Sequence, residues 1–247
     1  HWIMRSLGKY VTFMGSLLTR RETFSTYIKL IIQECVNVGY NSLFIVGIVS
    51  IFMGAVTTIQ TAFNLVSPFI PDYVISLVVR DMAILELSPT IIAIIFAGKV
   101  GSSIAGELGT MRITEQIDAL VTLSTNPMKY LTVPRVVAAT LAVPLLVAVG
   151  DSIGIMGGYI VGISRLGFNE AAYLKNTVDF LEHWDIFSGM IKGAAFGFIV
   201  ALMGCYYGIN SGRGAQGVGA ATKSAVVAAS VLILAANHFL TEVFFSA

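Results

Sequence analysis

Residues 35–71 read CVNVGYNSLFIVGIVSIFMGAVTTIQTAFNLVSPFIP and form the longest stretch of the sequence without a charged side chain. A helix that crosses the hydrocarbon core of a bilayer needs about 20 consecutive, mostly apolar residues. Residues 38–63 meet that requirement, and a polar, proline-containing segment from Asn64 to Pro71 follows them. The stretch therefore predicts a first transmembrane helix over 38–63.

The composition of the whole chain agrees with a membrane protein. Of the 247 residues, 56% are hydrophobic and 12% are charged, whereas a soluble domain carries about 25% charged residues. A net charge of +1 provides no basic surface for nucleic acid. The two cysteines, Cys35 and Cys205, form neither a disulfide framework nor a metal-binding spacing. These numbers exclude an ordinary soluble enzyme, a disordered protein and a nucleic-acid binder, and they favour one membrane domain over 1–247.

Four further spans follow the first. The second hydrophobic region, 73–105, is interrupted by Arg80, Asp81 and Glu86. Its charge-free part, 87–98, is too short to cross a bilayer alone, which places Glu86 within the membrane or at its edge. The remaining spans are predicted near 135–165, 186–208 and 224–241. We therefore expect an all-α integral membrane fold of about five helices, with spans one and two in 38–105 and spans three to five in 133–247.

Basic residues indicate the orientation of these spans. Residues 1–30 carry apolar side chains at helical spacing (Leu7, Val11, Met14 and Leu18) among arginines and lysines. This pattern favours an interfacial amphipathic helix over a solvated tail. Lysine and arginine also gather in 99–135 and 209–223. In a five-span protein both of these connections lie on the same side of the membrane as the N-terminal segment. The positive-inside rule then predicts a cytoplasmic N-terminus and a periplasmic C-terminus.

Small residues repeat every four positions in three of the predicted spans. They are Gly150, Gly154, Gly158 and Gly162; Gly189, Gly193 and Gly197; and Ala97, Gly101 and Ala105. Such strips let a second helix approach closely. The sequence leaves open whether that second helix belongs to the same subunit or to another copy.

Three ionisable residues are expected inside the membrane, where a charge is costly and faces a cavity or a partner. Glu86 either faces a cavity or is neutral or paired with Arg80. Asp151, deep in the glycine-rich third span, is interpreted as a structural polar contact. Lys192 either extends its ammonium group toward the membrane surface or pairs with an acidic group.

The connection over 106–127 reads GELGTMRITEQIDALVTLSTNP and combines a charged face with an apolar stripe. Ile113, Ile117, Leu120 and Val121 lie at the spacing of one helical face. An amphipathic helix between two spans suits either docking into a groove of another protein or a place on the membrane surface. The residues alone leave both interpretations open.

Four segments carry a resemblance to a known family: ELSPTIIAIIFAGKVGSSIAGELGTMRITEQIDAL at 86–120, NPMKYLTVPR at 126–135, DSIGIMGGYIVG at 151–162 and GRGAQGVGAATKSAVV at 212–227. They resemble the MlaE permease family, the membrane subunits of MCE-type lipid transporters; Ser88 replaces the glycine of the family's E-L-G-P. The resemblance implies a homodimeric ABC permease of the bacterial inner membrane that moves phospholipid or a related lipid. It also implies a cytoplasmic ABC ATPase that binds ATP and Mg, and a periplasmic MCE-domain partner.

The resemblance also implies two sets of functional residues. The ATPase-coupling set in 106–127 consists of Glu107, Arg112, Ile113, Glu115, Ile117, Asp118 and Leu120. In the family, lipid lies between the first spans of the dimer. The corresponding lipid-binding set here consists of Phe52, Met53, Val56, Thr57, Gln60, Phe63, Asn64, Leu65 and Glu86.

Other functions have weaker support in the sequence. A P-loop requires G-x-x-x-x-G-K-[ST], and Ala220 stands where the lysine would follow Gly219, so we expect no cofactor on this chain. The glycines from Gly208 to Gly219 are interpreted as a flexible or tightly turned connection. An ion-coupled transporter would rely on Asp151 and Lys192, and a membrane-embedded lipid enzyme would rely on a cluster such as Glu182, His183 and Asp185.

Overall fold

A computed structural model describes residues 8, 24–65, 73–122, 126–179 and 181–245, and all elements within these ranges are helical. The first long helix consists of α2 (Phe24–Val38), η1 (Tyr40–Ser42) and α3 (Leu43–Asn64). The second consists of α4 (Tyr73–Met82), η2 (Ala83–Leu87), α5 (Ser88–Phe96), η3 (Ala97–Gly101) and α6 (Ser102–Ile113). After them come α7 (Gln116–Thr122), α8 (Pro127–Ser164), α9 (Glu170–Asp179), α10 (His183–Ile209) and α11 (Gly214–Phe245).

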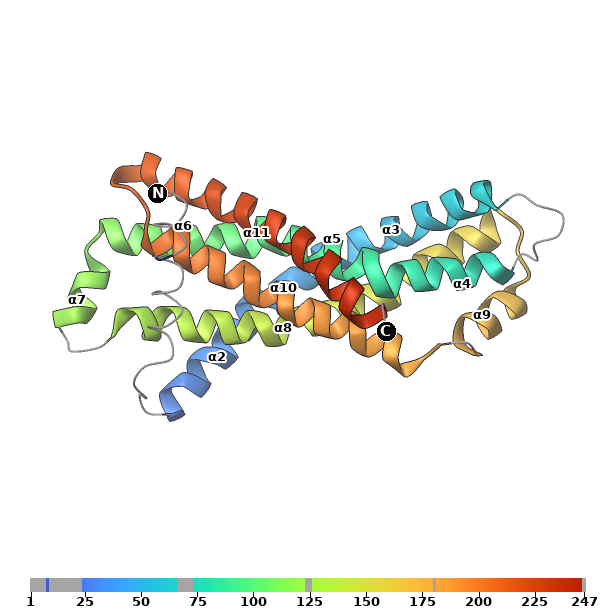
Figure 1. The fold of residues 1–247 in the computed structure, drawn as a ribbon, viewed down its shortest axis with the longest axis horizontal. Helices are drawn as coiled ribbons and strands as arrows, with labels where there is room; N and C mark the ends of the chain where they lie inside the picture. Colours follow the sequence, from blue (N-terminus) through green and yellow to red (C-terminus); the bar gives the residue numbers. More distant parts are fainter. Residues whose placement is uncertain (1–7, 9–23, 66–72, 123–125, 180, 246–247) are drawn as a thin grey trace.

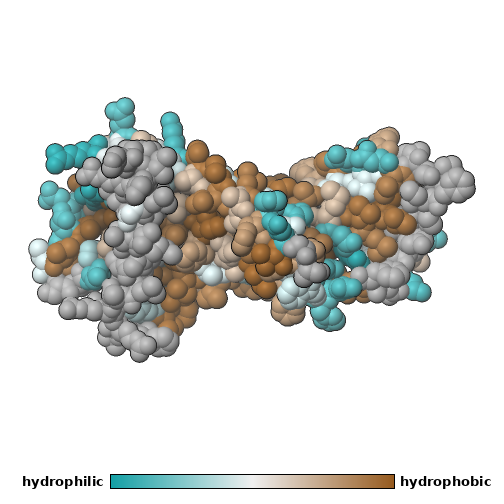
Figure 2. Space-filling view, in the orientation of Figure 1, coloured by the Kyte–Doolittle hydropathy of each residue, from teal (hydrophilic) through white to brown (hydrophobic). Residues whose placement is uncertain are grey.

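Five of these helices are long and apolar enough to cross a membrane, as predicted. They cover Tyr27–Asn64, Val74–Ile113, Pro127–Ser164, His183–Ile209 and Gly214–Phe245. The long helices lie side by side in an elongated bundle, with α7 at one end and α9 at the other (Figure 1). Apolar side chains cover the middle of the bundle, and hydrophilic ones gather at the α7 end (Figure 2). This banded surface fits a protein that crosses a bilayer.

Each helix extends beyond its predicted span. The third begins at Pro127, where Asn126 caps it by accepting a hydrogen bond from the Met128 N–H at 3.1 Å, as an N-cap residue should. The interpretation of Gly208–Gly219 as a turned connection is only partly right, because α11 already begins at Gly214. The apolar stripe predicted within 1–30 lies outside the described residues, and residues 24–30 belong to α2.

The glycine strips bring together helices of this one chain. A Cβ added at Gly54 of α3 would overlap the carbonyl oxygen of Gly154 on α8. A Cβ at Gly189 of α10 would lie 2.8 Å from the carbonyl oxygen of Ile84, and one at Gly204 would lie 3.0 Å from that of Gly101. The glycine strips are therefore used for packing within one subunit, the first of the two alternatives.

Candidate functional site

Two of the hollows along the bundle contain most of the predicted functional residues, and an ion pair with a fully buried lysine lies between the helices. The first hollow, here called the α3–α5 cavity, has a volume of about 560 Å³. Its lining residues are Ile48, Val49, Phe52, Met53, Val56, Thr57, Gln60, Thr61, Asn64, Met82, Leu87 and Ile91. Apolar side chains dominate one part of the lining, and hydroxyl and amide groups gather toward the end of α3.

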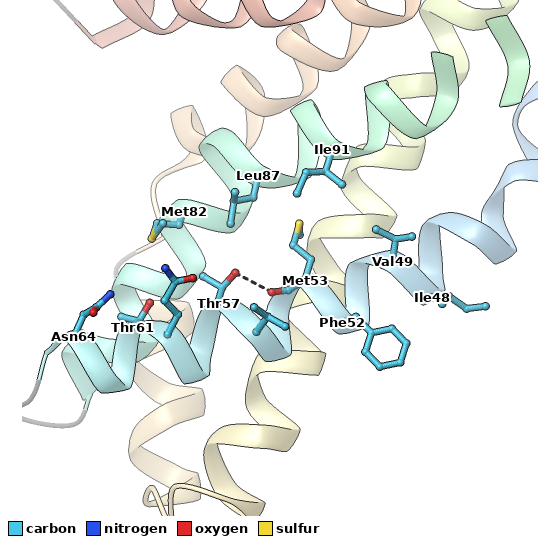
Figure 3. A pocket seen from close by; sticks show the side chains of 12 residues that line it. Ile48, Val49, Phe52, Met53, Thr57, Thr61, Asn64, Met82, Leu87 and Ile91 are labelled. Atoms are coloured by element: carbon cyan, nitrogen blue, oxygen red, sulfur yellow. Dashed lines mark hydrogen bonds between the residues drawn. The ribbon is translucent and has the colours of Figure 1, made fainter. Parts of the chain in front are cut away.

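Helical periodicity explains this lining. Met53 and Thr57 follow each other at a spacing of four on α3, so they share one face. The Thr57 hydroxyl donates to the Met53 carbonyl at 2.8 Å, which satisfies it within the helix. Figure 3 shows Met53 extending toward Leu87 and Ile91 on the facing helix, while the ring of Phe52 turns away from them. The cavity is thus a gap between the first and second long helices.

Six of the nine residues predicted to bind lipid line this cavity: Phe52, Met53, Val56, Thr57, Gln60 and Asn64. Phe63, which is 74% exposed, Leu65 and Glu86 are not among the lining residues. The sequence analysis missed the opposite wall, formed by Met82, Leu87 and Ile91. These three residues lie near Glu86 in the second hydrophobic region, which the sequence analysis recognised as a span. Periodicity alone does not tell which face of that span meets α3.

Glu86 belongs to a partly buried polar cluster that connects three long helices. Lys192, which has no exposed surface, donates to Glu86 Oε1 at 2.9 Å, to the Leu85 carbonyl at 2.8 Å and to Thr241 Oγ1 at 2.8 Å. Asn237 Nδ2 donates to Glu86 Oε2 at 2.7 Å. Pro89 lacks an N–H for the Leu85 carbonyl four residues earlier, so Lys192 provides this oxygen with a donor.

The prediction that Lys192 pairs with an acidic group is confirmed, and the suggested Glu86–Arg80 pair is wrong. Arg80 instead donates to Asp81 Oδ1 at 2.7 Å and to the Thr177 carbonyl at 3.1 Å. The physical reason is that Lys192 approaches Glu86 from α10, while the guanidinium of Arg80 is held by its neighbour Asp81 and by α9.

The second hollow, here called the α7 groove, lies at the opposite end of the bundle from α9. It has a volume of about 940 Å³ and is lined by Arg112, Ile113, Glu115, Ile117, Asp118, Ile209, Asn210, Ser211, Gly212, Arg213 and Gly214. Five of the seven predicted coupling residues are therefore brought together here. The sequence analysis missed the second wall, which is the turn between α10 and α11. Arg112 joins the two walls because its guanidinium donates to the Ile209 carbonyl.

The coupling segment is not the single short helix that was predicted. Glu107–Ile113 continue the second long helix, and α7 starts anew at Gln116. Between them Glu115 has a left-handed φ of 58°, a conformation that costs a non-glycine residue about 1 kcal/mol or more. The predicted stripe is thus divided: Ile117 and Leu120 pack against the core, whereas Ile113 and Val121 are exposed.

The other two predicted coupling residues do not line the groove: Leu120 packs against the core, and Glu107 belongs to a separate ion cluster. Arg135 of α8 contacts Glu107 Oε2 at 3.1 Å and Glu34 Oε1 of α2 at 3.6 Å. Ser103 Oγ donates to the other Glu107 oxygen at 3.0 Å. The cluster connects α2, α6 and α8, and its two glutamates line a hollow other than the α7 groove.

Comparison with known proteins identifies the family of this chain. The model of the family "Permease MlaE" matches residues 31–243, most of the chain. The chain belongs to the MlaE permease family. A "Probable ABC transporter permease protein" of Rickettsia conorii is 46% identical to this permease over 241 residues, covering 98% of this chain and 93% of that protein. A relative of the same printed name from Synechocystis is 38% identical over 208 residues, covering 84% of this chain and 79% of that protein.

A plant relative extends the comparison. The protein named "TRIGALACTOSYLDIACYLGLYCEROL 1, chloroplastic" of Arabidopsis thaliana is 39% identical over 160 residues, covering 65% of this permease and 46% of the plant protein. This permease is therefore a multi-pass membrane subunit of the ABC transporter class.

Proposed function

We propose that this permease moves a phospholipid or related lipid between the inner membrane and a periplasmic MCE-domain assembly, driven by a separate ABC ATPase. The observation that carries the proposal is the lining of the α3–α5 cavity. Its apolar part suits acyl chains, which offer no hydrogen bonds. Gln60, Thr61 and Asn64 supply amide and hydroxyl groups at one end, where a polar head group would be satisfied.

Photocrosslinking in native membranes tests the lipid part of this proposal. A photoreactive amino acid replaces Ile91, which lines the cavity. As the control, the same photoreactive amino acid replaces Leu234 of α11, which is 55% exposed and does not line the cavity. We expect mass spectrometry to find phospholipid adducts several-fold enriched at position 91, with a narrower set of lipid classes than at 234. Equal yields and compositions at both positions would contradict a specific lipid cavity.

The α7 groove is proposed to receive the ATPase. In this arrangement the N-terminus lies in the cytoplasm, and a homodimer of this permease binds two ATPase copies. Its lining alternates charged and apolar side chains, a composition typical of the rim and centre of a protein interface. Residues 114 and 115 join α7 directly to α6, and α6 continues through η3 into α5. A shift of α7 that pulls on α6 therefore reaches the wall of the α3–α5 cavity through one long helix.

Reversing the charges of Glu115 and Asp118 tests the docking site. With both residues changed to lysine, we expect ATP hydrolysis by the assembled complex to fall about tenfold, because one charge-assisted hydrogen bond contributes about 1.5–3 kcal/mol. Glu170→Lys on α9 is the control and should leave hydrolysis unchanged. Normal hydrolysis by a folded double variant would remove this groove as the coupling site.

A further inference from the structure

Three buried side-chain oxygens at one level of the bundle have no partner among the residues that the structure describes. They are Ser50 Oγ of α3, Ser88 Oγ of α5 and Asp151 Oδ1 of α8. Their residues are 1%, 0% and 8% exposed. A buried polar atom without a hydrogen bond costs about 1–3 kcal/mol, and an isolated carboxylate costs considerably more. Such a group in a native fold indicates a bound water, an ion or a proton.

The three helices converge at this level. A Cβ added at Gly150, next to Asp151, would lie 3.0 Å from Ser50 Oγ and would overlap the Ile92 side chain of α5. The Ser88 side chain lies close enough to the Asp151 carboxyl to influence its charge, although the two groups form no hydrogen bond of ordinary geometry. Val49 and Leu87, the chain neighbours of the two serines, line the α3–α5 cavity. Two helices of the cavity wall, α3 and the second long helix, therefore also carry the cluster.

Among the residues that the structure describes, no charged side chain forms an ion pair with Asp151. α3 and α5 contain no ionisable residue. Glu86 of η2 and Lys192 of α10 pair with each other, and Arg80 of α4 pairs with Asp81. On α8 itself, Arg135 lies 16 residues away, about 24 Å along a helix, and contacts Glu34 of α2 and Glu107 of α6. Lys175 of α9 and His183 and Asp185 of α10 form no ion pair with Asp151 either. Tyr159 of α8 and Tyr173 of α9 carry no positive charge.

We propose that Asp151, Ser50 and Ser88 form a binding site for one monovalent cation, either a proton or an alkali-metal ion. One positive charge neutralises the carboxylate, and the two hydroxyls provide further oxygen ligands or hydrogen-bond partners for it. Because the three residues come from α3, α5 and α8, occupancy of the site holds the cavity wall together. The site does not depend on the identity of the transported lipid or of the ATPase.

Infrared spectroscopy of the permease in lipid nanodiscs tests the site without any transport assay. The difference spectrum between the wild type and Asp151→Asn isolates the signal of this carboxyl. Spectra are recorded from mildly acidic to mildly alkaline pH in choline chloride, sodium chloride and potassium chloride. A protonated-carboxyl band that persists in all three salts identifies the proton as the occupant. A band that sodium or potassium removes, and choline does not, identifies the metal ion.

An ionised carboxylate whose spectrum responds neither to pH nor to any of the three salts would overturn the proposal. Ser88→Ala is expected to weaken cation binding about tenfold, the effect of losing one hydrogen bond near a charge. Ser152→Ala on α8, the helix of Asp151, is the control, because Ser152 is exposed and its hydroxyl donates to the Ala148 carbonyl. Equal affinities of the two serine variants would also overturn the assignment.

Discussion

Replacing Lys192 with methionine is expected to lower the free energy of unfolding by about 3 kcal/mol. Methionine preserves the apolar stem of the side chain but removes the ammonium group that contacts Glu86, Leu85 and Thr241. Removing one member of a buried ion pair costs about 3–5 kcal/mol because the other charge is left unpaired. We expect the lower end, because the Glu86 side chain is 40% exposed. Thermal unfolding in mild detergent measures the difference.

Two controls separate the ion pair from a general effect of losing a lysine. Lys223→Met removes an exposed lysine of α11 and should change stability by less than about 0.5 kcal/mol. Combining Lys192→Met with Glu86→Gln removes both charges, so it should recover at least half of the loss. A double variant as unstable as Lys192→Met alone would show that the unpaired carboxylate is not the cause.

The second large effect is expected at the contact between α3 and α8. Gly54→Ala places a methyl group onto the carbonyl oxygen of Gly154, which belongs to a helix backbone and has no rotamer with which to move away. Overpacking costs about 1–3 kcal/mol, and a clash with backbone belongs at the upper limit. We expect a loss of about 3 kcal/mol in the same unfolding assay and a lower yield of folded protein.

Gly47→Ala is the matched control on the same helix. A Cβ there would lie 3.6 Å from the Ile153 Cδ1 atom, an ordinary van der Waals contact. This variant should be as stable as the wild type or slightly more stable, because alanine favours a helix over glycine by about 1 kcal/mol. If the two alanine variants unfold alike, close backbone approach between α3 and α8 is not what requires Gly54.

The sequence was sufficient to predict the number of long helices, because charge-free runs follow directly from the chemistry of the bilayer. It underestimated their lengths, because helices continue past the apolar core and accept charges that find partners, such as Arg135 in α8. The break at Glu115 escaped prediction, since a left-handed residue there has no glycine or proline to mark it. Each hollow was predicted from one wall only, because the facing wall depends on which helices pack together.

The hydrogen bonds of Asn237 and Thr241 to Glu86 have a consequence for the biogenesis of this protein. Chains are synthesised and fold from the N-terminal side, so Glu86 and Lys192 enter the membrane before α11 does. Until α11 is in place, the pair lacks both of these side chains. A ribosome-bound or prematurely terminated chain would thus expose an incompletely satisfied ion pair in the bilayer, which gives membrane quality control a physical signal for an unfinished permease.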